Sequence, residues 1–173
     1  SAGALIAPFA FLGPDYDDVL EDIYTTSRTE DLLVPTLFSG VLRGAGLADT
    51  SGLAAKIAQY VTADFLAEVA AEHRRGRALL VGTTNIDAQR PVIWDMGAIA
   101  ASGHPDALEL FRDVILASAS IPVAFPPVLI PVTAPDGRSF DEMHVDGGAT
   151  SQVTFVSPRV PIAEATRRML GDD

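Results

Sequence analysis

Residues 78–84 read Ala-Leu-Leu-Val-Gly-Thr-Thr, a continuous apolar run of strand length that follows a helical segment. Such a run is typical of a central strand covered on both faces. A second strand candidate covers residues 91–96, and the polar residues 85–90 form the turn between the two. Residues 128–133 and 140–146 are two further strand candidates, joined by a turn that contains Pro135-Asp136-Gly137-Arg138.

Segments with the apolar spacing of helices lie before these strand candidates and between them. Residues 2–12 are apolar throughout and end at Gly13, which predicts a buried helix, whereas residues 14–24 form an amphipathic surface helix. Ser51 and Thr62 are the expected N-caps of the next two helices. These two helices are expected to cover residues 51–60 and 62–75, and a further helix is expected over residues 105–118. Helices that alternate with apolar strands predict an α/β layered domain.

The composition is that of a folded, acidic domain. The chain has 173 residues, of which 48% are apolar and 20% charged, and this length fits one domain. Its net charge of -11 argues against a nucleic-acid partner. The absence of cysteine excludes disulfides, thiolate metal ligands and a cysteine nucleophile. No apolar stretch is long and uninterrupted enough to span a bilayer, although contact of apolar loops with a membrane surface stays open.

Two short segments carry the candidate chemistry. Ser1-Ala2-Gly3 matches the second half of a G-x-S-x-G nucleophile elbow, in which small residues let a strand turn sharply into a helix. Asp146 ends a strand, and Gly147-Gly148 after it permit a tight exit. A serine hydroxyl needs a neighbouring base to become a nucleophile. Ser1 is therefore the candidate nucleophile, Asp146 its base, and the backbone N–H of Ala2 an oxyanion donor.

The motifs together resemble a known family. Ser1-Ala2-Gly3 and Asp146-Gly147-Gly148, with residues 80–85, 117–122 and 125–127 between them, make nearly the whole chain similar to bacterial patatin-like phospholipases. The resemblance implies a three-layer α/β/α fold and a Ser-Asp dyad that hydrolyses acyl esters of lipids without a metal or another cofactor. By this match Ser1 is the nucleophile and Asp146 is the base. A lipid or acyl-ester substrate and peripheral contact with a bacterial membrane follow as expectations, whereas the cellular location is unknown.

The chain departs from the family pattern at its ends. Family members have a strand and a glycine-rich oxyanion loop before the nucleophile, whereas this sequence starts at Ser1. We therefore expect residues 1–173 to be a single patatin-like catalytic domain that is incomplete at both ends, an internal fragment that begins at the nucleophile. Whether such a fragment is active by itself is a separate question, because losing one oxyanion donor typically costs a factor of about 100 to 1,000 in rate.

Alternatives from other classes remain. Ser1 could be an N-terminal nucleophile with its own α-amine as the base, but such a residue usually leads a strand, and the residues after Ser1 are helical in character. A Ser-Asp-His triad in the α/β-hydrolase order requires a histidine after Asp146, and the sequence has none there. A third alternative is an inactive fragment, or a binding or structural relative of the same fold. Ser118, Ser120 and Asn85 are further candidates for lining the site.

Overall fold

The computed structural model describes residues 3–26, 34–35, 48–122 and 124–149 of the chain. Its main sheet has four antiparallel strands in the order β4-β3-β6-β5, and the short strands β1 (Val34–Pro35) and β2 (Ala48–Asp49) pair separately. The strands of the main sheet are β3 (Leu80–Asn85), β4 (Arg90–Asp95), β5 (Val128–Thr133) and β6 (Ser139–Asp146). The helices are α1 (Gly3–Leu12), α2 (Asp17–Thr26), α5 (Ser51–Tyr60), α6 (Ala63–Arg74), α7 (Met96–Ala101) and α8 (Ala107–Ala119), with two 3-10 turns, η1 (Pro14–Tyr16) and η2 (Gly147–Ala149).

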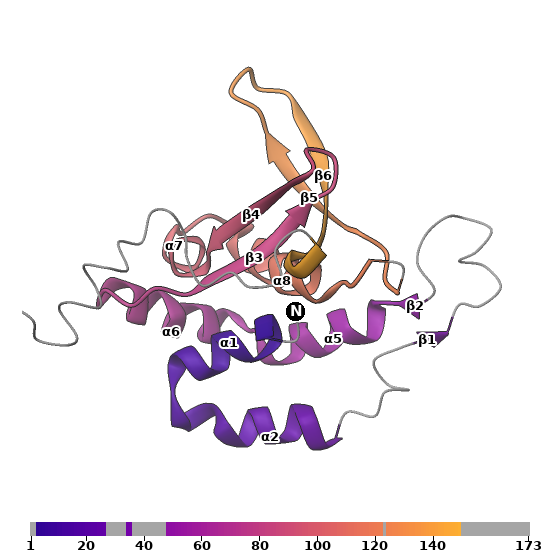
Figure 1. The fold of residues 1–173 in the computed structure, drawn as a ribbon. Coiled ribbons are helices and arrows are strands. Elements are labelled where there is room, and N and C mark those ends of the chain that lie inside the picture. Colours follow the sequence, from indigo (N-terminus) through magenta and orange to yellow (C-terminus); the bar gives the residue numbers. More distant parts are fainter. Residues whose placement is uncertain (1–2, 27–33, 36–47, 123, 150–173) are drawn as a thin grey trace, which may run out of the picture.

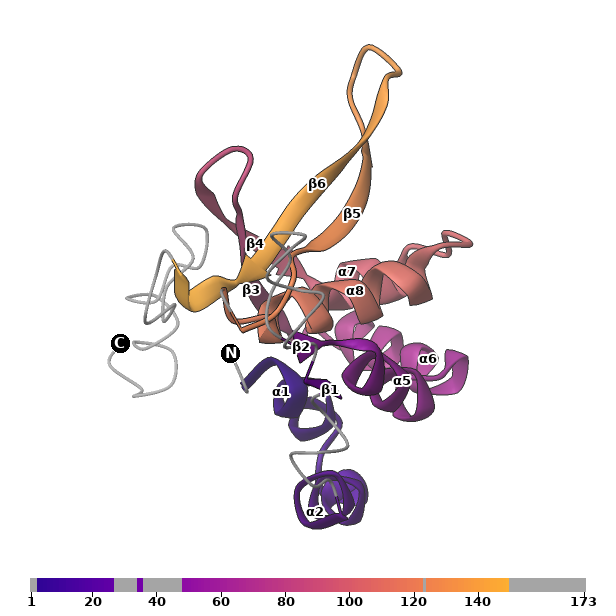
Figure 2. The same ribbon diagram turned by 90° about the vertical axis from the view of Figure 1, so that its right-hand side faces the viewer.

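The described helices all lie on one side of the main sheet (Figures 1 and 2). Helix α8 packs directly against β3, β5 and β6, while α1 and α5 pack against α8 and α6 packs against α7. The expected α/β class is confirmed. The described residues form a sheet with helices on one side, and the three-layer α/β/α arrangement stays a prediction.

The core lies between the sheet and α8 and continues beneath α8. Phe111 and Val114 of α8 are fully buried, as is Ile130 of β5 on the sheet side. On the other side of α8, the rings of Phe9 and Phe65 lie 5.0 Å apart, and Phe65 makes an edge contact with Phe111. Because α1 contributes Phe9 to this cluster and touches α2, α6 and α8, its all-apolar sequence is explained.

Local geometry confirms two predicted helix boundaries and corrects a third. Helix α1 ends at Leu12 and is followed by Gly13, whose φ of 106° favours glycine. Thr62 caps α6 by accepting a hydrogen bond from the Phe65 N–H at 3.3 Å. The predicted cap at Ser51 is wrong, because Ser51 is already the first residue of α5 and Thr50 takes the cap position.

The expectation that the strand at residues 78–84 is covered on both faces is only half right. Both neighbours of β3 run antiparallel to it. An antiparallel sheet can leave one face open, whereas a parallel sheet with crossover helices cannot. On the face away from α8, Leu80 is 41% exposed and Ile93 of β4 is 37% exposed.

Candidate active site

The candidate nucleophile precedes α1 in the sequence. Ser1 and Ala2 lie outside the described residues, so their predicted roles stay predictions, and Gly3 is the first residue of α1. The first turn of α1 and the turn η2, which follows Asp146, lie near each other in both ribbon views (Figures 1 and 2). Both α1 and β6 pack against α8, and the start of α1 and the end of β6 lie in one region of the molecule.

Asp146 is held at the end of β6 by its backbone and by its side chain. Its N–H donates to the carbonyl of Ser120 at 2.8 Å, and its own carbonyl accepts from the Thr84 hydroxyl at 3.0 Å. Its carboxylate oxygen Oδ1 accepts from the Gly148 N–H at 2.7 Å. These contacts come from three different segments, so the orientation of the partly buried Asp146 is set by the surrounding fold.

The glycine pair after Asp146 allows a close approach to β3. A Cβ atom at Gly147 would meet the carbonyl oxygen of Gly82, which the Ser118 hydroxyl also contacts at 2.7 Å. A Cβ at Gly148 would lie 3.2 Å from Oδ1 of Asp146. The predicted tight exit after Asp146 is confirmed, and it depends on close contact with the neighbouring backbone.

Three further residues of the expected site have structural contacts. Ser118 and Ser120 are buried at the end of α8, where the Ser120 hydroxyl donates to the carbonyl of Leu116 at 2.8 Å. Asn85 is also buried, and its Oδ1 accepts from the Ala88 N–H at 2.8 Å in the β3–β4 turn. Of the three, Ser120 touches Asp146, through its backbone carbonyl.

The two threonines of β3 also surround the candidate base, and they were not among the residues predicted from the sequence. Thr84 contacts the Asp146 carbonyl, as described above, and Thr83 is the cross-strand partner of Asp146. Both are buried, and Thr83 also bonds to His144 and Trp94. A Thr-Thr pair that ends an otherwise apolar strand was the available signal, because buried hydroxyls need partners.

A family comparison decides the classification. The model of the patatin-like phospholipase family matches residues 1–165, which is most of the chain. The chain belongs to the patatin-like phospholipase family. The resemblance found in the sequence is thereby confirmed, and membership assigns the chain to a family of lipid acyl hydrolases with lipid substrates. A search of curated proteins gave no match.

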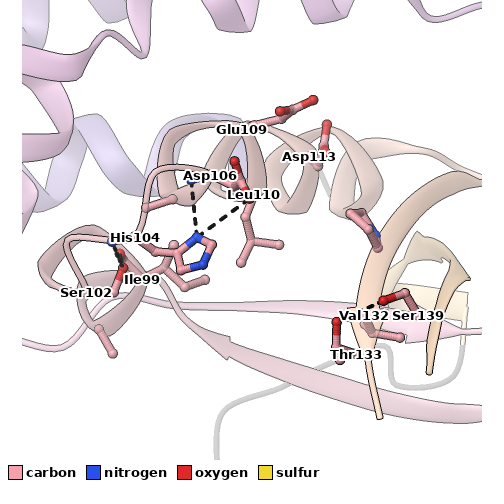
Figure 3. Close-up of a pocket in the computed structure, with 13 residues that line it drawn as sticks. Ile99, Ser102, His104, Asp106, Glu109, Leu110, Asp113, Val132, Thr133 and Ser139 are labelled. Atoms are coloured by element: carbon pink, nitrogen blue, oxygen red, sulfur yellow. Dashed lines mark hydrogen bonds and ion pairs between the residues drawn. The ribbon is translucent and has the colours of Figure 1, made fainter. Parts of the chain in front are cut away.

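Figure 3 shows a cavity of about 790 Å³ in this patatin-like domain, and the candidate base Asp146 is not among the residues that line it. It is bounded by α7, the start of α8 and the β5–β6 hairpin, and Ser139 at its edge begins the strand that Asp146 ends. Burial first, and the nearby charge of Glu109 second, raise the pKa of Asp113 in its wall to about 6. The cavity and the candidate site thus lie at opposite ends of β6.

The described residues hold neither a candidate metal cluster nor a candidate membrane-spanning helix. Within them, no group of three or more His, Cys, Asp or Glu side chains is arranged to hold a metal ion. No described helix of this patatin-like domain has the length and apolar character needed to cross a bilayer.

Proposed function

We propose that this protein is a serine hydrolase that cleaves acyl esters of lipids through a Ser1-Asp146 dyad and an acyl-serine intermediate. Family membership supports hydrolysis of a lipid substrate. The observation that carries the proposal is the way in which Asp146 is held at the end of β6, with its carboxylate bonded to the Gly148 N–H at 2.7 Å. A base must keep one orientation to accept a proton from a particular hydroxyl.

The proposed chemistry has two stages. In the first, Asp146 accepts the Ser1 hydroxyl proton while Oγ attacks the ester carbonyl carbon, and the Ala2 N–H stabilises the oxyanion. Collapse of the tetrahedral intermediate releases the alcohol, which takes the proton from Asp146. In the second stage, Asp146 accepts a proton from water, whose oxygen attacks the acyl-serine, and the carboxylic acid leaves as Ser1 recovers its proton.

The test uses the full-length protein and a serine-directed fluorophosphonate together with a chromogenic acyl ester. Ser1→Ala is expected to abolish labelling, and Asp146→Asn is expected to slow ester hydrolysis by roughly 100- to 10,000-fold, the range for loss of a general base. Asp141→Asn is the matched control, because Asp141 is an exposed carboxylate on the same strand. Full activity in Asp146→Asn would overturn the dyad. Absence of labelling in the wild-type protein would favour an inactive relative of the fold.

The proposal includes peripheral contact with lipid aggregates, since a lipid ester is presented at an interface. The net charge of -11 makes attraction to anionic lipids unfavourable. We therefore expect the full-length protein to co-sediment with zwitterionic vesicles at least as well as with anionic ones. Stronger sedimentation with anionic vesicles would contradict this expectation.

A further inference from the structure

We infer that His144 is a positioning residue for Asp146, held in its Nε2–H tautomer by a buried hydrogen-bond chain that joins three strands. The inference rests on the proposed role of Asp146 as the base. Both Thr83 and His144 have 0% exposed surface, so protein groups rather than bulk solvent must satisfy their polar atoms.

Trp94 fixes the donor-to-acceptor direction at one end of this hydrogen-bond chain. An indole N–H can only donate, so Thr83 Oγ1 accepts from Trp94 Nε1 at 2.8 Å. The Thr83 hydroxyl has one hydrogen of its own, and His144 Nδ1 lies 2.9 Å away. If the hydroxyl donates this hydrogen, Nδ1 is the unprotonated nitrogen of the imidazole.

For a neutral imidazole, the contact with Glu142 at the other end of this hydrogen-bond chain indicates the same direction. His144 Nε2 lies 3.3 Å from Oε2 of Glu142, and an ionised carboxylate can only accept. Nε2 must therefore carry the hydrogen. The Trp94 ring also packs against the imidazole, with the ring centroids 5.5 Å apart, which restricts rotation of His144. Of the two neutral tautomers, the one with the hydrogen on Nε2 satisfies every hydrogen bond between Trp94, Thr83, His144 and Glu142.

The hydrogen-bond chain runs across the sheet beside the candidate base. Trp94 belongs to β4, Thr83 to β3 and His144 to β6. Thr83 lies opposite Asp146 in the β3–β6 register, and His144 precedes Asp146 by two residues and therefore shares its face of the sheet. Loss of these hydrogen bonds frees the end of β6 to shift relative to β3. A displacement of about 1 Å can cost on the order of 100-fold in rate.

The first arm of the test is spectroscopic and does not require activity. A two-bond ¹H–¹⁵N correlation spectrum of the full-length protein, with His144→Gln to assign the signal, should show Nε2 protonated and Nδ1 unprotonated. Thr83→Val should alter the Nδ1 resonance, because it removes the donor to that nitrogen. A resting protein with the hydrogen on Nδ1 would overturn the inference.

The second arm is kinetic. Thr83→Val should lower kcat by about 10- to 100-fold with KM within about twofold, and Thr83→Ser, which keeps the hydroxyl, should restore most of the activity. Trp94→Phe keeps the ring and removes the donor, so it serves as the second variant if Thr83→Val does not fold. Thr133→Val is the matched control, because Thr133 lies on β5, where its hydroxyl is 3.3 Å from that of Ser139.

The outcomes separate the two proposals. An unchanged kcat in both Thr83→Val and Trp94→Phe, with Asp146→Asn inactive, would overturn the positioning role and leave the dyad standing. Full activity in Asp146→Asn would instead remove the proposed base, and the positioning role with it, whatever the spectrum shows.

Discussion

A Cβ atom on Gly147 would lie 2.6 Å from the carbonyl oxygen of Gly82 and 2.8 Å from its carbonyl carbon. Both obstacles are backbone atoms of a strand inside the sheet, so they cannot move aside independently. Gly147→Ala is therefore expected to lower the free energy of unfolding by about 1–3 kcal/mol, as overpacking does. It should also reduce ester hydrolysis, because it displaces the residue next to Asp146.

Gly148→Ala is the matched comparison for this prediction. Its Cβ would meet Oδ1 of Asp146 at 3.2 Å, and that obstacle is a side-chain atom. We expect a smaller loss of stability in urea unfolding than for Gly147→Ala, together with reduced hydrolysis because the carboxylate is displaced. Equal destabilisation by the two substitutions would contradict the close-packing argument.

Asp113 should make stability depend on pH. Burial, followed by the charge of Glu109, raises its pKa from 3.8 to about 6. The folded state therefore binds this proton more tightly than the unfolded state, so the stabilisation is complete below about pH 4 and is lost as the pH rises through about 6. Above that range, the buried charge is a net cost to folding.

Asp113→Asn removes this titration. Urea unfolding should show the variant to be more stable than the wild type by about 1–2 kcal/mol near pH 7.5, after allowance for solvent screening, and should show no such gain near pH 4. Asp141→Asn, at an exposed position, should show no comparable pH-dependent difference. A gain of equal size at both pH values would refute the assignment to Asp113.

Gly97 is required by the ring of His73. A Cβ at Gly97 would lie 2.4 Å from His73 Nδ1 and 2.7 Å from Cγ, so Gly97→Ala should cost about 1–3 kcal/mol of stability. His73→Ala removes the ring atoms and leaves the Cβ of residue 73, which lies 2.9 Å from the added atom. Thermal unfolding of the double variant should therefore show less destabilisation than the sum of the single variants, whereas simple additivity would contradict the contact.

Arg112 ties α8 to the end of α5. Its guanidinium donates to the Val61 carbonyl at 2.9 and 2.7 Å and to the Ala58 carbonyl at 3.1 Å. Arg112→Lys keeps the charge but loses the fork geometry, so we expect a lower melting temperature, with a loss of about 1–2 kcal/mol. Arg138→Lys in the exposed hairpin turn is the control, and an equal effect there would count against the bridging role.

Local patterns in the sequence predicted much of the fold. The apolar run at residues 78–84, the periodicity that gives α8 and the turn signal around Gly137 all correspond to observed elements, and Gly137 has a φ of 84°. Strand direction was harder to predict, because an apolar run is compatible with parallel and antiparallel neighbours. The pairing of β3 with β6 joins residues about 60 positions apart, and no local pattern encodes that register.

The candidate site was predictable where a motif marks it. Asp146 and the two glycines after it form a recognisable triplet, and their tight geometry follows from glycine itself. The contacts of Thr84 and Ser120 with Asp146 were not predictable, because they depend on the strand pairing and on the position of the α8 end. The bonds of His144 to Thr83 and Glu142 were not predictable for the same reason.

The most direct test compares the rate of fluorophosphonate labelling at Ser1 in full-length wild-type protein, Asp146→Asn and Asp141→Asn. We predict that labelling slows by roughly 100-fold or more in Asp146→Asn and stays at the wild-type rate in Asp141→Asn. Labelling of Ser1 in Asp146→Asn at the wild-type rate would contradict the account, because Asp146 could not then be the group that activates the serine.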